Sequence, residues 1–158
     1  MLMQTRSFFK KSLARNILPG LESGEFTPFY QPKLDLSSRK IIGLEALPRW
    51  YASGVGWISP AEFIPVAEST GAIIPLAECI LFAACKQTKY WQENGFPELS
   101  VSVNLSPLQL DKKNIVSRVE GILSQTGFDA KFLELEVTES VLIQNSLSAL
   151  NALNEFKK

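Results

Sequence analysis

Strand-like and helix-like runs alternate through most of this 158-residue chain. Two strand-like runs, residues 99–105 and 132–137, are separated by a helix-like segment over residues 106–126. A connection of this length returns the chain along the sheet, so the two strands are expected to be parallel. Another helix-like segment, residues 75–94, precedes them, and a last one begins near Asn145. This order predicts an α/β fold with a parallel sheet covered by helices.

The first two strands of the sheet are expected to pair in the antiparallel direction. Residues 29–36 and 40–50 are both strand-like, and only Ser37-Ser38-Arg39 separates them. This link is too short for a parallel crossover, so the two strands should form an antiparallel hairpin. A helix is expected next, from Ser59-Pro60 to about Glu68, because proline is favoured at the first helical position.

The two parallel strands each have an apolar face and a polar face. In the first, valines alternate with Ser102 and Asn104, and in the second, leucines alternate with Glu134 and Glu136. Parallel strands buried on both sides are usually apolar throughout. A barrel resolves this conflict, because the apolar faces pack on outer helices while polar residues near the strand ends gather at the mouth.

The segment Gly43-Leu44-Glu45-Ala46-Leu47-Pro48-Arg49-Trp50 presents a similar polar face. Because side chains alternate in an extended chain, Glu45, Leu47 and Arg49 point the same way. Taken alone, this pattern is also typical of a solvent-facing strand with an ion pair. Asn104 and Glu136 add oxygen-bearing side chains near the ends of the two later strands, so the three strands together offer hard ligands.

These side chains are expected to meet, because functional groups of barrels gather at the C-terminal ends of the strands. Glu45, Asn104 and Glu136 would supply two carboxylates and an amide oxygen, which suit Mg²⁺ or Mn²⁺. Arg49 suits a phosphate group, because its guanidinium can donate two parallel hydrogen bonds. The residues therefore predict a metal-dependent reaction on a phosphate ester, with a purely structural polar network as the alternative.

Composition excludes several classes of protein. The 16 basic and 16 acidic residues cancel, so nucleic acid is not expected as a partner. The absence of histidine removes Ser-His-Asp triads and the usual zinc sites. Cys79 and Cys85 lie in an apolar helical stretch at a spacing that fits neither a disulfide nor a Cys-x-x-Cys motif. They are expected to be reduced core residues of a cytoplasmic protein.

The N-terminal stretch is basic and forms a segment of its own. Residues 1–18 contain four basic residues and no acidic one, and their apolar residues are too interrupted for a signal peptide. We expect a basic lead-in helix or linker over residues 1–23 and one main domain over residues 24–158. A role in membrane-surface binding or partner docking is the alternative for the first segment. No run approaches the roughly 20 apolar residues of a membrane span.

Several of these segments resemble the EAL domain family, the phosphodiesterases that linearise the bacterial messenger cyclic di-GMP. Glu45-Ala46-Leu47 stands in a Gly-x-Glu-Ala-Leu-x-Arg-Trp setting like that of the family signature. Further matches follow in family order from about Gly24 onward: Phe29-Tyr30-Gln31-Pro32, residues 58–68, Ser102-Val103-Asn104-Leu105-Ser106 and residues 133–140. The resemblance implies a TIM-like (β/α) barrel of EAL type that opens with an antiparallel hairpin.

The resemblance also implies roles for individual residues. Glu45, Asn104 and Glu136 correspond to ligands of Mg²⁺ or Mn²⁺. Glu45 also corresponds to the catalytic residue. Those that correspond to contacts with cyclic di-GMP are Gln31, Leu47 and Arg49. Glu139 corresponds to a glutamate that supports the active-site loop and the dimer face.

The resemblance covers only the first part of the family's domain. A complete barrel needs roughly 250 residues, and no Asp-Asp-Phe-Gly motif follows the last helix-like segment of this sequence. We therefore expect about half a barrel, whose unpaired edges favour association with a second copy or with the missing C-terminal half.

Two functional hypotheses follow. In the first, the chain is the N-terminal part of a cyclic di-GMP phosphodiesterase and is inactive on its own. In the second, it is a non-catalytic cyclic di-GMP-related binding or protein-interaction module, or a truncated remnant.

Overall fold

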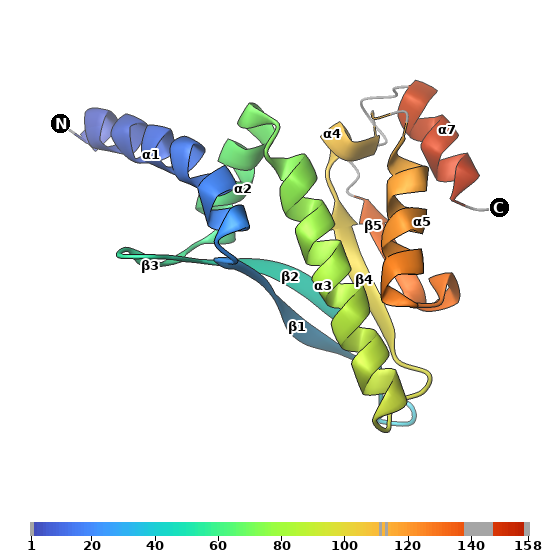
Figure 1. The fold of residues 1–158 in the computed structure, drawn as a ribbon. Coiled ribbons are helices and arrows are strands. Elements are labelled where there is room, and N and C mark those ends of the chain that lie inside the picture. Colours follow the sequence, from blue (N-terminus) through green and yellow to red (C-terminus); the bar gives the residue numbers. More distant parts are fainter. Residues whose placement is uncertain (1, 111, 113, 138–146, 157–158) are drawn as a thin grey trace.

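The computed structural model describes residues 2–110, 112, 114–137 and 147–156 (Figure 1). Its strands are β1 (Phe26–Leu34), β2 (Ile41–Ala52), β3 (Gly56–Ile58), β4 (Ser100–Leu105) and β5 (Leu133–Val137). Its helices are α1 (Leu2–Glu22), α2 (Pro60–Thr70), α3 (Ile73–Glu93), α4 (Pro107–Leu110), α5 (Ile115–Thr126), the 3₁₀ turn η1 (Ala130–Phe132) and α7 (Leu147–Glu155).

The strands form one open sheet in the order β1-β2-β4-β5, with β3 paired to β2. β1 and β2 are antiparallel, which confirms the predicted hairpin, whereas β2 and β4, and β4 and β5, are parallel. Across the described residues the sheet does not close on itself. The expected barrel is thus seen only as an open, mixed α/β sheet.

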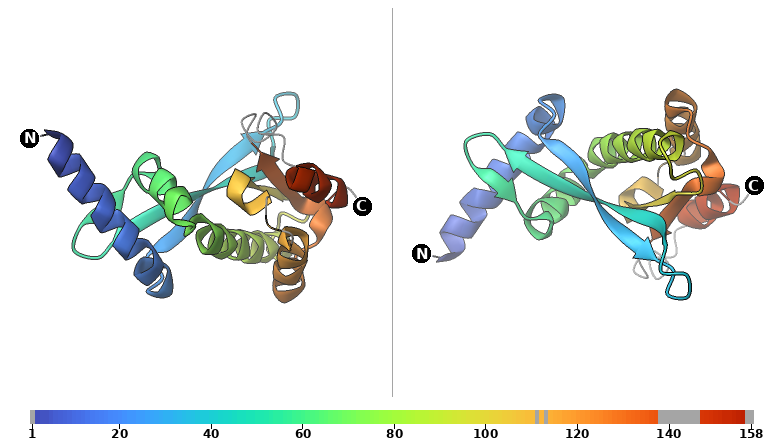
Figure 2. Two further views of the ribbon diagram at one scale, coloured as in Figure 1. Left: turned by 90° about the horizontal axis from the view of Figure 1, so that it is seen from above. Right: turned by 90° about the horizontal axis from the view of Figure 1, so that it is seen from below.

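Helices cover one side of this sheet and leave the other side open (Figure 2). α3 and α5 pack on the apolar faces of β4 and β5, where Val101, Val103 and Leu105 are buried with Ile80 and Ala84 of α3. The alternation of apolar and polar residues along β4 and β5 explains this arrangement, because on these two strands only one face offers apolar surface for the helices to bury. The polar side chains therefore lie on the uncovered face.

A second hydrophobic cluster joins α1 and α2 to the far end of β2. Leu13 and Ile17 of α1 are buried with Phe63 of α2 and Trp50 of β2. Trp50 is fully buried and stacks on Phe26, with ring centroids 4.8 Å apart. The last residue of the signature segment is therefore part of the core.

Glu25 connects the same cluster to the turn after β2. Its carboxylate accepts a hydrogen bond from the Trp50 indole N–H at 2.9 Å and one from the Ser53 backbone N–H, also at 2.9 Å. These donors, the indole first, hold the pKa of Glu25 below its usual value. The charged form of Glu25 is thus favoured in the folded chain.

This pKa shift makes stability depend on pH with a definite sign. A depressed carboxyl pKa contributes stability above the unfolded pKa, near 4.3, and that contribution is lost as pH falls toward the folded pKa. We expect Glu25→Gln to lower the melting temperature at pH 7, and the difference from wild type to shrink as pH falls toward 3. Thermal unfolding followed by circular dichroism between pH 3 and 7 measures this difference. A constant difference across that range would contradict it.

Several boundaries differ from the sequence-based expectation. The segment expected as one helix over 106–126 is divided into α4 and α5, and β3 was not predicted. β2 also continues to Ala52, because residues 50–52 pair with β3. In the described part of the chain, no helix is both long and apolar enough to cross a membrane.

Candidate functional site

The predicted alternation along β2 is seen in its burial, because Ala46 and Trp50 are buried whereas Glu45, Leu47 and Arg49 are only partly buried. Glu45 lies opposite Gln31, Leu47 opposite Phe29, and Arg49 opposite Thr27. Glu45 was expected near the end of its strand, but it lies in the middle of β2, because the strand continues to Ala52. Pairing with β4 nevertheless ends at Ala46, so Glu45 is close to the end of the parallel part of the sheet.

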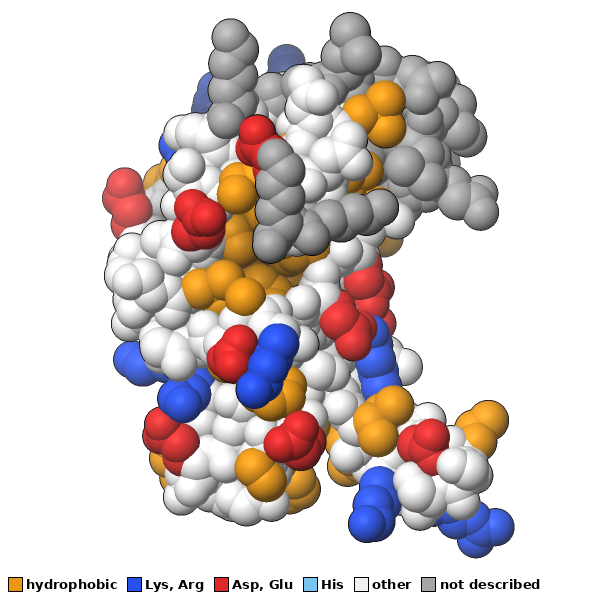
Figure 3. Space-filling view, turned by 90° about the vertical axis from the view of Figure 1, so that its right-hand side faces the viewer, with side chains coloured by type: hydrophobic (Ala, Val, Ile, Leu, Met, Phe, Trp, Pro, Cys, Tyr) orange, Lys and Arg blue, Asp and Glu red, His pale blue; other side chains and the backbone are white. Residues whose placement is uncertain are grey.

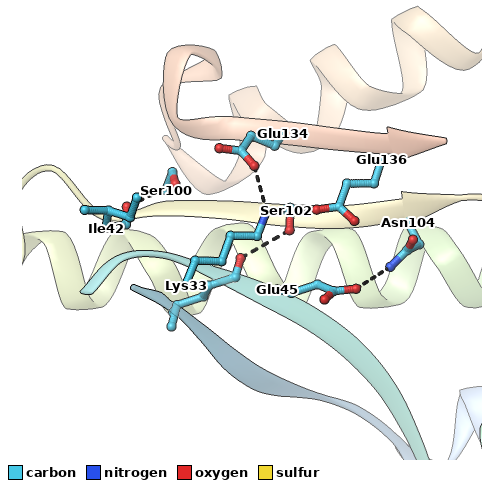
Figure 4. Close-up of polar contacts among 9 residues, drawn as sticks. Lys33, Ile42, Glu45, Ser100, Ser102, Asn104, Glu134 and Glu136 are labelled. Carbon is cyan, nitrogen blue, oxygen red and sulfur yellow. Dashed lines mark hydrogen bonds and ion pairs between the residues drawn. The ribbon is translucent and has the colours of Figure 1, made fainter. Parts of the chain in front are cut away.

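Glu45, Asn104 and Glu136 lie close together on the open face (Figure 4). The Asn104 amide donates a hydrogen bond to Glu45 Oε1 at 2.9 Å, which links β2 to β4. Asn104 is the direct register partner of Glu136 on β5. The structure thus brings the three predicted metal ligands to adjacent positions of three neighbouring strands.

Arg49 lies further along the same face of β2. Its guanidinium carbon is 5.6 Å from the centre of the Phe29 ring, and Nη1 donates to the Pro48 carbonyl oxygen at 2.9 Å. No carboxylate is paired with Arg49 among the described residues. The guanidinium is therefore held by a ring and a carbonyl, and its charge is free for an anionic ligand.

A cavity of about 500 Å³ opens where β2 and β4 separate. Three of the predicted site residues line it: Leu47, Arg49 and Asn104. Glu68 of α2 lies in the same wall, where it accepts a hydrogen bond from the Ser106 hydroxyl at 3.0 Å. Most of the remaining lining is apolar, as is typical of small-molecule sites.

The other predicted residues are placed as follows. Gln31 is exposed on β1 and does not line this cavity. Glu45 and Glu136 are partly buried beside the cavity rather than in its lining. Glu139 lies outside the described residues, so its assignment as a loop and dimer residue stays a prediction.

Lys33 is a site residue that the sequence analysis missed. Its ammonium is 2.8 Å from Glu134 Oε2 and 2.8 Å from Glu136 Oε1. These contacts, with that to Glu134 first, raise the pKa of Lys33. They also lower the pKa of Glu136, with a smaller effect from the Ser102 hydroxyl. Lys33 lies two residues after Gln31, so the strand period already predicted that both side chains share a face of β1. That Lys33 pairs with Gly43 depends on the register of the hairpin, which the sequence does not show.

Aromatic side chains were also missed. Phe29, Tyr51 and Trp57, which we call the aromatic strip, are each about half exposed. The Trp57 ring contacts Phe29 and Tyr51, with ring centroids 5.4 and 5.1 Å apart. By strand alternation and pairing the strip continues the face of Leu47 and Arg49. On another side of the molecule, seen from α5 and α7, apolar side chains lie in a hollow with acidic and basic side chains around it (Figure 3).

The donors at the open face fit part of the coordination sphere of a hard cation. Glu45, Asn104 and Glu136 offer oxygen atoms, which Mg²⁺ and Mn²⁺ prefer. The set is incomplete, since within the described ranges no three residues among His, Cys, Asp and Glu come together in a way that could hold a metal. The fit is therefore that of one side of a site.

Fold and site together define an α/β protein whose open sheet face gathers carboxylate, amide, lysine and arginine side chains. The profile of the EAL domain matches residues 13–158. The chain therefore belongs to the EAL domain family.

The chain is also similar to individual curated proteins. The chain is 46% identical over 138 residues to an uncharacterised protein of Sinorhizobium fredii, covering 87% of this chain and 16% of that protein. It is 33% identical over 156 residues to the cyclic di-GMP phosphodiesterase PdeR of Escherichia coli, covering 99% of this chain and 23% of the relative.

Among solved structures, the chain is similar to the c-di-GMP complex of the PaMucR phosphodiesterase. The TM-score is 0.86 at 34% identity, over 92% of this chain and 59% of that one. The chain thus spans less than a quarter of these two curated relatives and just over half of that solved chain.

Proposed function

We propose that this chain contributes to the active site of a metal-dependent cyclic di-GMP phosphodiesterase. The observation that carries the proposal is the hydrogen-bonded Glu45–Asn104 pair, which lies beside Glu136 and on the same sheet face as Arg49. Similarity to PdeR and PaMucR supports cyclic di-GMP as the ligand. In this proposal the open sheet is the first part of an EAL-type barrel.

The proposed reaction is hydrolysis of one phosphodiester of the cyclic dinucleotide. Water adds to phosphorus, the bond to the ribose 3′ oxygen breaks, and linear pGpG is the product. Glu45, Asn104 and Glu136 would hold Mg²⁺ or Mn²⁺, which when bound lowers the pKa of water and neutralises phosphate charge. Arg49 would donate hydrogen bonds to phosphate oxygens and stabilise their charge as it develops.

The cavity and the aromatic strip supply groups that suit guanine bases. The carboxylate of Glu68 can accept hydrogen bonds from the N–H donors of a guanine edge. The rings of the aromatic strip offer a stacking surface, which typically stabilises a bound base by about 1–3 kcal/mol. Leu47 and Gln31 would contact the ribose and base of the same ligand.

The proposed compartment is the cytoplasm. Cys79 and Cys85 are both free, and Cys85 is buried. Burial raises the pKa of the Cys85 thiol to about 12, so this side chain behaves as an apolar core residue. Two free thiols fit a reducing compartment.

Binding and turnover of cyclic di-GMP test the proposal in two steps. In equilibrium dialysis with Mg²⁺, we expect the chain to bind cyclic di-GMP on the order of tenfold more tightly than GMP, because GMP lacks the second base and both diesters. Absence of binding would contradict the proposal. Chromatography of the same mixture then shows whether pGpG forms.

A non-catalytic binding module is the second candidate function. The ion pair between Lys33 and Glu136 favours it, since the ammonium occupies a carboxylate that a catalytic metal would use. Binding of cyclic di-GMP with no pGpG above a metal-only blank would support this candidate. Turnover that disappears in Glu45→Ala would exclude it.

A further inference from the structure

The Lys33 side chain crosses the sheet to reach its partners. Lys33 is on the edge strand β1, while Glu134 and Glu136 are on β5, and two strands, β2 and β4, lie between them in the sheet order. Neighbouring strands are about 4.8 Å apart, so a flat sheet would place β1 and β5 about 14 Å apart. The curved sheet and the extended lysine side chain together span this gap (Figure 4).

Small residues leave the path of this side chain clear. Gly43 is the register partner of Lys33. A Cβ atom at position 43 would lie 2.5 Å from Ser100 Oγ and 3.8 Å from Lys33 Cδ. The residue on the same side of β4 nearer the site is Ser102, which is small and buried. Gly43 therefore makes room for the Ser100 side chain, while a Cβ atom there would be in ordinary contact with the lysine.

The contact brings one positive charge between two negative charges. Glu134 and Glu136 project from the same face of β5, and two carboxylates this close repel each other unless a cation lies between them. Among the described residues the only ammonium or guanidinium paired with either is that of Lys33. Glu136 is also one of the three residues assigned to the metal above.

We propose that Lys33 is the built-in counter-ion of this site and competes with the divalent metal for Glu136. The inference rests on the proposed function, because it takes Glu136 as a metal ligand. Without metal, the single positive charge of the ammonium offsets one of the two negative charges, reduces the repulsion between the glutamates and keeps β5 close to β1. A dication that takes Glu136 meets a like charge nearby, and this repulsion lowers metal affinity.

Lys33→Met tests the competition, because it keeps an unbranched side chain and removes the charge. We expect Mn²⁺ affinity, measured by calorimetry, to rise on the order of tenfold. We also expect a lower melting temperature without metal and a larger increase of that temperature when Mn²⁺ is added. Lys33→Arg keeps the charge and should behave as wild type. Lys89→Met is the matched control, since Lys89 pairs with Glu93 on α3, away from the site.

The outcomes separate this inference from the proposed function. If Glu136→Gln weakens Mn²⁺ binding but Lys33→Met leaves it unchanged or weaker, the counter-ion proposal is wrong and the metal assignment stands. If Glu136→Gln has no effect on Mn²⁺ binding, the metal assignment fails and the competition fails with it. If Lys33→Met binds Mn²⁺ more tightly than wild type, while Lys33→Arg binds it as wild type does, the proposal is supported.

Discussion

Trp50→Ala is expected to lower the free energy of unfolding by about 3–5 kcal/mol, the usual cost of removing a fully buried tryptophan. Trp50 has no exposed surface, stacks on Phe26, and meets Phe63 edge-on with ring centroids 5.8 Å apart. The substitution also leaves Glu25 without its indole donor. Because domains are stable by only about 5–15 kcal/mol, this loss removes a large fraction of the stability of the chain.

Urea unfolding followed by circular dichroism measures this effect without relying on tryptophan fluorescence. Trp57→Ala is the matched control, because Trp57 is 59% exposed and its removal leaves no buried cavity. We expect the control to cost less than about 1 kcal/mol. Equal losses in the two variants would contradict the assignment of Trp50 to the core between α1, α2 and β2.

Arg49→Ala is expected to weaken cyclic di-GMP binding by roughly 10- to 150-fold, the factor that corresponds to losing charged hydrogen bonds worth about 1.5–3 kcal/mol. The guanidinium lines the cavity and is held by Phe29 and the Pro48 carbonyl rather than by a carboxylate. Its loss should leave folding almost unchanged, since the side chain is only partly buried. Dialysis and thermal unfolding of the same preparation measure both quantities.

Two further variants sharpen this result. Arg49→Lys keeps the charge but loses the two-pronged donor geometry, so an intermediate affinity is expected. Arg118→Ala removes an arginine that pairs with Glu78 away from the cavity and should bind as wild type. Wild-type affinity in Arg49→Ala would show that the ligand is held elsewhere.

Much of the fold could be predicted because β4 and β5 alternate apolar and polar residues and because the connections between strands differ clearly in length. The antiparallel hairpin followed from a link of three residues, and the parallel pair followed from a helix-length connection. The break between α4 and α5 was missed although the polar run over residues 111–114 interrupts the apolar spacing of this segment. β3 consists of only three residues, too few for a period to be recognised.

The site was predictable to the extent that it depends on alternation within one strand. That Glu45, Leu47 and Arg49 share one face can be predicted from the two-residue period of β2 alone. Lys33 depends instead on the register between β1 and β2 and on the curvature of the whole sheet, which no single segment contains. Residues that act across several strands are for this reason the ones that sequence reasoning misses.

The most direct test of the proposed site is to map cyclic di-GMP on the ¹⁵N-labelled chain by NMR. We predict that added ligand with Mg²⁺ shifts the backbone amide signals of residues 45–51 on β2 and 102–106 at the end of β4, and that Arg49→Ala greatly reduces these shifts. Signals from α5 and the first half of α1 should not move. Shifts confined to those helices, or no shifts at ligand excess, would contradict the claim that the open sheet face of this EAL chain binds cyclic di-GMP.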